Sequence, residues 1–219
     1  MNESPINATL SIPGPAGRIE VAFDEAEAPR QPLLAIVCHP LPTEGGSMHN
    51  KVVTMAARAL RECGIATLRF NFRGVGASEG RFDDGHGELD DLRAVAAWAR
   101  AQHPGQALWL AGFSFGAWVS LRGAAELGAG ALVSIAPPVG RGWSFDGIVL
   151  PEVPWLVIQG QADEIVDAAA VRDWVAGLPR PPKLVEMPDT GHFFHRRLMD
   201  LRGALKNGIR DWLPPAVQA

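Results

Sequence analysis

The feature that most constrains the fold of this chain is a series of unbroken apolar runs separated by segments of helical periodicity. The runs cover residues 33–39, 65–71, 107–113, 131–137, 153–160 and 183–188. Runs that are apolar at nearly every position fit parallel strands buried on both faces of a sheet. Two shorter runs near the start, TLSIP and RIEVAF, are also expected to be strands.

The segments between these runs have the spacing of amphipathic helices. Their apolar positions are Val52, Val53, Ala56, Ala59 and Leu60 in the first, and Leu89, Leu92, Val95, Ala96 and Trp98 in the second. Further helices are expected over 115–128, 168–178 and 198–213. This alternation predicts an α/β fold: a mostly parallel, twisted sheet flanked by helices on both faces, joined by right-handed crossovers. Because no linker or low-complexity segment divides the chain, residues 1–219 are expected to form a single domain.

Composition narrows the classes of function. The net charge of -4 and the pI near 5.9 provide no basic face for phosphates, so nucleic acid is not an expected partner. The N-terminal segment MNESPINATL does not resemble a signal peptide, and no apolar stretch is long enough for a membrane span. Cys38 and Cys63 lie outside any C-x-x-C pair and are interpreted as thiols of a cytoplasmic protein, with a disulfide between them left open. The oligomeric state is also left open.

The pattern G-x-S-x-G occurs twice, as GASEG at 76–80 and as GFSFG at 112–116. In hydrolases that use it, the serine lies on a sharp turn between a buried strand and a helix. Ser78 is followed by the polar stretch RFDDGHGE, which cannot begin a helix at once, so it is expected to cap or turn a loop. Ser114 has an apolar run directly before it and an alanine-rich helical segment directly after it. Ser114 is therefore the candidate nucleophile, and an ordinary helix N-cap is the alternative.

A serine nucleophile needs a base, and the base needs a group that orients it. Both are expected after later strands, because ligands of such sheets lie at the carboxyl ends of the strands. Asp163 follows the run 153–160 and is the candidate acid; Glu164 is expected to point away, and Asp167 to cap the next helix. His192 follows the run 183–188 and is the candidate base. The less suitable histidines are His39, His49, His86, His103 and His195.

The chemistry also needs donors for a developing oxyanion. The backbone N–H of Phe115, directly after the nucleophile, is one candidate. The second is expected in the loop HPLPTEGG. Because Pro40 and Pro42 have no N–H, Leu41 is the first residue after His39 that can donate.

Several segments together resemble the α/β-hydrolase superfamily, in particular its small bacterial serine hydrolases. They are CHPLPTEGGSMHNKVV, RFNFRGVGASEG, AGFSFGA, QGQADEIV and GHFF, and the similarity extends from about residue 33 to 212. The resemblance implies Ser114, Asp163 and His192 as the triad and supports Leu41 and Phe115 as the oxyanion hole. Only residues 139–152 separate ALVSIAPP from the next strand, so no cap domain is expected.

These features predict a serine hydrolase that cleaves a carboxylic ester or thioester of a small soluble molecule through an acyl-enzyme. The pocket is expected to be shallow, with walls formed by Leu41, Trp143, Phe145, Ile165 and Phe193. The superfamily also contains peptidases and acyltransferases, and a non-catalytic small-molecule binder on the same scaffold is a further alternative.

No cofactor and no metal are expected. His192 and His195 have helical spacing, but no further carboxylate or cysteine cluster accompanies them. The RGVGASEG stretch has Glu79 where a dinucleotide-binding motif has its third glycine, and a carboxylate there would repel pyrophosphate. Membrane association is not expected either.

Overall fold

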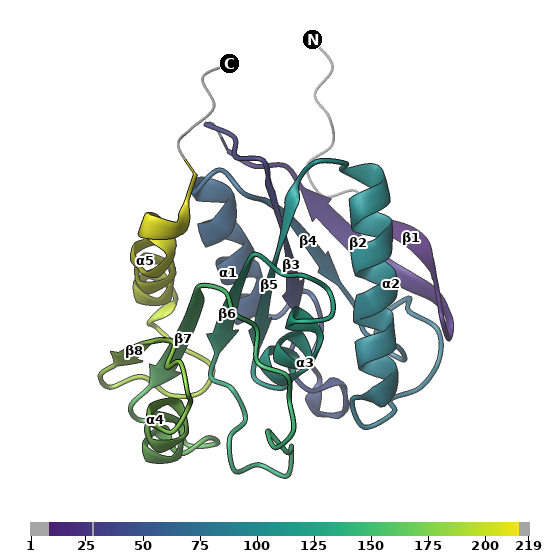
Figure 1. Ribbon diagram of the computed structural model, residues 1–219. Coiled ribbons are helices and arrows are strands. Elements are labelled where there is room, and N and C mark those ends of the chain that lie inside the picture. Colours follow the sequence, from purple (N-terminus) through teal and green to yellow (C-terminus); the bar gives the residue numbers. More distant parts are fainter. Residues whose placement is uncertain (1–8, 28, 215–219) are drawn as a thin grey trace.

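Eight strands form one sheet between two layers of helices (Figure 1). The computed structural model describes residues 9–27 and 29–214. The strand order is β1-β2-β4-β3-β5-β6-β7-β8. The β1–β2 and β2–β4 pairs are antiparallel, and all later neighbours are parallel. The strands are β1 (Thr9–Gly14), β2 (Gly17–Asp24), β3 (Leu33–Cys38), β4 (Ala66–Phe70), β5 (Ala107–Phe113), β6 (Ala131–Ile135), β7 (Trp155–Gly160) and β8 (Lys183–Met187).

The helices divide between the two faces of the sheet. They are α1 (Lys51–Glu62), α2 (His86–Gln102), α3 (Phe115–Ala124), α4 (Ala168–Ala176) and α5 (Leu198–Ile209), with short 3-10 helices η1 (Pro42–Glu44) and η2 (Arg210–Trp212). The core on one face contains residues of α1 and α5, and the core on the other contains residues of α2, α3 and α4. The predicted fold class, a mostly parallel sheet covered on both faces, is therefore confirmed.

Strand β3 shows why its sequence is apolar throughout. Leu33, Ala35 and Val37 pack against α1 and its neighbours, whereas Leu34 and Ile36 pack into the opposite core. Successive side chains of a strand point to opposite faces, so a strand with two covered faces needs apolar residues at every position.

Four of the strands, β3, β4, β6 and β8, end one or two residues before their apolar runs do. The run predicted over 131–137 becomes a strand only as far as Ile135. Ala136 has a φ of 45°, and Pro137 has no N–H for the ladder, so the chain leaves the sheet here although its side chains remain buried.

Four parallel strands bring the predicted site residues to one edge of the sheet. Leu41 follows β3, Ser114 follows β5, Asp163 follows β7 and His192 follows β8. β3 pairs with β5 and β7 pairs with β8, and only β6 lies between the two pairs. The carboxyl ends of these strands therefore gather the four residues, as expected for this type of sheet.

No helical cap covers this edge within the described residues. The chain between β6 and β7 contains neither helix nor strand, and it is fastened to α3 by the indole N–H of Trp118, which donates to Ser144 O at 2.8 Å. In the part of the chain that the structure describes, no helix is both long and apolar enough to cross a bilayer.

Candidate active site

Ser114 lies at a sharp turn between β5 and α3. Its φ is 52°, which is unusual for a residue with a side chain, and its N–H donates to Ile135 O at 2.8 Å. Gly112 and Gly116 make the turn possible. A Cβ on Gly112 would overlap the backbone of Gly116, and a Cβ on Gly116 would overlap the carbonyl oxygens of Cys38 and His39. The backbone therefore approaches so closely at both positions that only glycine fits without a rearrangement.

A chain of hydrogen bonds joins the three predicted triad residues. The Ser114 hydroxyl lies 3.1 Å from His192 Nε2, and His192 Nδ1 lies 2.8 Å from Asp163 Oδ2. The side chains of His192 and Asp163 are only 3% and 0% exposed, whereas Ser114 is half-buried and lines a pocket. The hydroxyl is therefore the member of this chain that a ligand can reach.

The Asp163 carboxylate is fully hydrogen-bonded. Oδ1 accepts from the backbone N–H groups of Ile165 and Val166 at 2.9 and 2.7 Å, and Oδ2 accepts from His192 and from Gln159 Nε2 at 2.9 Å. Burial opposes ionisation, but the hydrogen bonds from His192 and the two backbone groups outweigh it, so the pKa of Asp163 lies below its usual value. This carboxylate can keep the His192 ring in one orientation.

The two residues predicted as oxyanion donors line the same pocket as Ser114. Leu41 and Phe115 both line it, and neither N–H has an acceptor among the residues that the structure describes. The contact of Gly116 with the carbonyls of Cys38 and His39 holds the start of α3 against the loop that carries Leu41. That loop is closed by Leu41 O, which accepts from Glu44 N and Gly46 N at 3.2 and 3.0 Å.

His39 stabilises this loop, a role that the sequence did not reveal. Its Nδ1 lies 2.6 Å from Pro40 O, and its Nε2 accepts from Phe72 N at 3.0 Å. Burial lowers the pKa of His39 to about 4, so the ring is neutral, with its proton on Nδ1. A polar side chain at the end of an otherwise apolar run was the available signal.

The prediction that Glu164 points away from the site is wrong. Its Oε2 accepts from the backbone N–H of His192 at 3.1 Å. Two adjacent acidic residues therefore form hydrogen bonds with His192: Asp163 with its ring and Glu164 with its backbone N–H. Asp167 caps α4 as predicted, since its Oδ1 accepts from Ala169 N at 2.9 Å.

The pocket at Ser114 has a volume of about 420 Å³. Of the predicted wall residues, Leu41, Trp143, Ile165 and Phe193 line it. The prediction for Phe145 is wrong: its ring packs on Trp174, with the centroids 4.8 Å apart, and does not line the pocket. Sequence could not reveal this, because nothing in an irregular connection fixes the direction of a side chain. Polar lining residues that were not predicted include Glu44, Asn50 and Arg141.

Ser78, the serine of the other G-x-S-x-G pattern, lies in a loop as predicted. Its hydroxyl accepts from Glu20 N at 2.9 Å and donates to Asn71 O at 2.6 Å. Cys38 and Cys63 are both free thiols. Within the described ranges, no group of three or more His, Cys, Asp or Glu side chains is placed to hold a metal ion.

Comparisons with known proteins agree on one family. A family model described as serine aminopeptidase, S33, matches residues 41–151. A solved α/β serine hydrolase without lid from Xanthomonas campestris is 62% identical, with a TM-score of 0.93, and the match covers 98% of this chain and 99% of that one. An α/β serine hydrolase homologue from Coxiella burnetii is 41% identical, with a TM-score of 0.90 over 95% of this chain and 100% of that one. An uncharacterized protein of Rickettsia prowazekii is 35% identical over 205 residues, which are 89% of this chain and 85% of that protein.

Proposed function

Because the chain belongs to the α/β-hydrolase family of serine hydrolases without a lid, we propose that it cleaves a carboxylic ester or thioester through an acyl-enzyme on Ser114. One observation carries this proposal. The hydrogen-bonded chain from Ser114 through His192 to Asp163 opens into a pocket that also presents two free backbone N–H groups. Nucleophile, base, orienting acid and oxyanion donors are thus available at one place.

In the acylation step, Ser114 Oγ attacks the carbonyl carbon of the substrate while His192 Nε2 takes the hydroxyl proton. The carbonyl oxygen becomes an oxyanion and accepts hydrogen bonds from the N–H groups of Leu41 and Phe115. The bond to the leaving oxygen or sulfur then breaks, and His192 returns the proton to that atom. Asp163 stabilises the imidazolium that exists between these two transfers.

Deacylation repeats the sequence with water as the nucleophile. His192 takes a proton from the water as the new C–O bond forms, the oxyanion again occupies the Leu41 and Phe115 donors, and the proton passes to Ser114 Oγ as the acid leaves. The side chain of His192 is 3% exposed, and that of Asp163 is not exposed. Both residues can therefore keep their arrangement through the two half-reactions.

The substrate class follows from the pocket. A cavity of about 420 Å³ with Leu41, Trp143, Ile165 and Phe193 among its lining residues suits a small, partly apolar acyl group. Aminopeptidase activity is the second candidate, because the matching family model has that description and because Glu44 places a carboxylate in the pocket wall that could bind an α-amino group.

A fluorophosphonate probe tests the proposal directly. The protein should be labelled on Ser114 and should hydrolyse short-chain p-nitrophenyl esters, and Ser114→Ala should lose both properties. Ser11→Ala removes an exposed hydroxyl from β1 and should lose neither. Folded wild-type protein that is neither labelled nor active on any ester, thioester or aminoacyl anilide would contradict a hydrolase and favour a binding protein.

The pH dependence provides a second test of His192 as the base. Only an unprotonated base can accept the serine proton, so kcat/KM should be lost in acid while the protein is still folded. A kcat/KM that stays constant in acid would count against this assignment.

The reaction is assigned to a reducing compartment such as the cytoplasm because both cysteines are free. Burial raises the pKa of the Cys38 thiol to about 12, so it should react with a thiol reagent only after unfolding. Protein purified from its host without reductant should contain two titratable thiols in denaturant, and none would contradict the assignment.

A further inference from the structure

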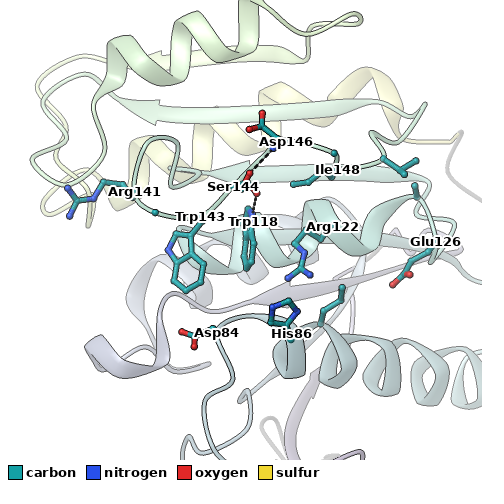
Figure 2. Close-up of a pocket in the computed structure, with 15 residues that line it drawn as sticks. Asp84, His86, Trp118, Arg122, Glu126, Arg141, Trp143, Ser144, Asp146 and Ile148 are labelled. Atoms are coloured by element: carbon teal, nitrogen blue, oxygen red, sulfur yellow. Dashed lines mark hydrogen bonds between the residues drawn. The ribbon is translucent and has the colours of Figure 1, made fainter.

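A larger groove adjoins the pocket of Ser114. It has a volume of about 1170 Å³ and lies between the start of α2, the side of α3 that carries Trp118 and Arg122, and the connection from β6 to β7 (Figure 2). Arg141 and Trp143 line both the groove and the pocket. The two hollows therefore adjoin each other at these residues.

One face of α3 leads from the nucleophile into this groove. Trp118 and Arg122 follow Ser114 at intervals of four residues, so the three lie on the same side of the helix. At 1.5 Å per residue, the Cα of Arg122 lies about 12 Å along the axis from that of Ser114. The Arg122 side chain turns back over the helix, and its guanidinium carbon lies 4.5 Å from the centre of the Trp118 ring. Nucleophile, indole and guanidinium thus follow one another over a path on the order of 10 Å.

Arg122 is a cation without a counter-ion. It makes no ion pair with any residue in 9–27 or 29–214, and its one hydrogen bond is from Nη1 to Gly85 O at 2.8 Å. Glu126 lies nearby, but both of its oxygens are bound by Arg93, at 2.7 and 2.9 Å. Burial, together with the charge of Arg93, lowers the pKa of Arg122 below its usual value, and the opposing charge of Glu126 does not restore it.

None of the other charged residues that line the groove forms an ion pair with Arg122. Figure 2 shows Arg122 near the middle of the groove, with Arg141 and Glu126 toward its two ends. Asp84 and Asp146 also line the groove, but neither is within ion-pairing distance of Arg122. Arg122 is therefore a cation in this groove that an anionic ligand could pair with.

The walls beside this cation are aromatic and fixed. The Trp118 ring is held by its hydrogen bond to Ser144 O, and it lies so close to Gly85 that a Cβ there would overlap it. The Trp143 ring lies 4.9 Å from both Trp118 and Phe115, measured between centroids. Two packed indoles offer an apolar surface between the reacting centre and the guanidinium, and no rearrangement is needed to form it.

The positions of His192 and Trp143 indicate which part of a substrate enters the groove. His192 must protonate the leaving group, so the leaving group lies on the side of His192 and of Phe193, whose ring centroid is 5.1 Å from that of His192. Trp143 packs instead on Phe115, the oxyanion donor. The acyl part is therefore the part that runs past Trp143.

We propose that the groove is a subsite for acyl groups that end in a carboxylate, so that the substrates are esters or thioesters of dicarboxylic acids esterified at one end. Arg122 binds the distal carboxylate, and Trp118 and Trp143 cover the spacer. A guanidinium fork suits a planar carboxylate better than a single-point cation does. This inference rests on the proposed function for the reaction at Ser114 and adds the class of acyl group.

The kinetic test compares p-nitrophenyl monoesters of dicarboxylic acids with neutral fatty-acyl esters of the same chain length, over a series of lengths. In the wild-type protein, the ratio of kcat/KM for the anionic ester to that for the neutral ester should reach about tenfold at the spacer length that spans Ser114 to Arg122. Arg122→Gln should reduce the ratio to about one or below. A ratio cancels any general damage that the substitution causes.

Arg100→Gln is the matched control. Arg100 also donates from a guanidinium to a backbone carbonyl between α2 and the end of α3, in this case Leu127 O, but it does not line the groove. The control should keep the wild-type ratio. The proposal is overturned if the wild type shows no preference for the anionic ester at any length, or if Arg122→Gln and Arg100→Gln give the same ratio.

A binding measurement separates this inference from the proposed function. Ser114→Ala should bind the non-hydrolysable monoamide of the preferred dicarboxylic acid, with a change in tryptophan fluorescence, and the additional substitution Arg122→Gln should weaken binding about tenfold. Binding that depends on Arg122 without hydrolysis of any ester by the wild type would support the groove and contradict the hydrolase. Hydrolysis by the wild type, with neither binding nor rate depending on the carboxylate, would support the hydrolase and contradict the groove as a carboxylate subsite.

Discussion

Ser78 and Ser114 each occupy the serine position of a G-x-S-x-G pattern. Replacing each by alanine should separate a contribution to stability from a contribution to catalysis. Ser78 is 6% exposed, and its hydroxyl joins Glu20 N, in β2, to Asn71 O, directly after β4. The half-buried Ser114 hydroxyl is joined to one side chain, that of His192 at 3.1 Å. The first hydroxyl therefore holds two parts of the sheet together, and the second is available for chemistry.

The magnitudes follow from these partners. Ser78→Ala leaves a backbone donor and a backbone acceptor without a partner, and a buried polar group left in this way costs about 1–3 kcal/mol. Glu20 is only partly buried, so its N–H can regain water, and we expect a total loss of about 2–3 kcal/mol in the free energy of unfolding. For a chain of this size each kcal/mol lowers Tm by about 2–4 °C, which gives a decrease of about 4–12 °C.

Ser114→Ala should have the opposite profile. Its free energy of unfolding should change by less than about 1 kcal/mol, because no structural contact depends on the hydroxyl. Its kcat should fall by a factor on the order of 10⁴ to 10⁶, as in other triad deletions. Thermal denaturation followed by circular dichroism and hydrolysis of a short p-nitrophenyl ester, measured on both variants, give the comparison. A Ser78→Ala protein with wild-type Tm and no activity, beside an active Ser114→Ala protein, would refute the assignment of both serines.

Three further outcomes are expected. Glu164→Ala should lower kcat about tenfold with little change in KM, because the backbone N–H of His192 loses its acceptor. Glu164→Gln keeps an acceptor oxygen and should lower kcat less. Equal decreases in kcat for the two variants would contradict this role. The hydrogen bond from Arg202, together with those from Lys206 and Arg58, lowers the pKa of Glu62 to about 2. Ionised Glu62 should therefore stabilise the fold by about 1–2 kcal/mol above about pH 4.5, and this stabilisation should disappear as the pH falls toward 2. The free energies of urea unfolding of Glu62→Gln and wild type should differ at pH 7 and converge in acid. Activity should not rise sharply when an ester passes from solution into an emulsion, because no lid has to open; a steep rise at the interface would show that one exists.

Most of the sheet could be predicted because burial on both faces leaves a strong mark on the sequence. The run 107–113 became β5 with the same ends, since Ser114 turns the chain immediately after it. Strand ends were less accurate where apolar side chains continue beyond the ladder, as at Ala136 and Pro137, which are buried but belong to no strand. Apolar character reports burial, whereas a strand also requires an extended backbone, which Ala136 with its positive φ does not have.

The members of the site that could be predicted are those tied to strand ends. Ser114, Asp163 and His192 were found because a parallel sheet brings the carboxyl ends of its strands together. Glu164, His39 and Phe145 could not be placed in this way. The direction of each depends on a tertiary contact, with His192 N, with Phe72 N and with the Trp174 ring respectively. Sequence spacing within one segment contains no information about such contacts.

The position of Arg122 in the groove could be predicted from the sequence only in part. The spacing of Ser114, Trp118 and Arg122 at four-residue intervals can be read from the sequence, and it places the three on one side of any helix that begins after Ser114. Trp118 on that side is covered by Gly85, at the start of α2, and by Trp143 of the connection after β6, whereas Arg122 one turn further along stays partly exposed. Within the described residues no carboxylate pairs with Arg122, because both oxygens of the neighbouring Glu126 are bound by Arg93. A carboxylate at the far end of a bound substrate would supply the counter-ion that these contacts leave out.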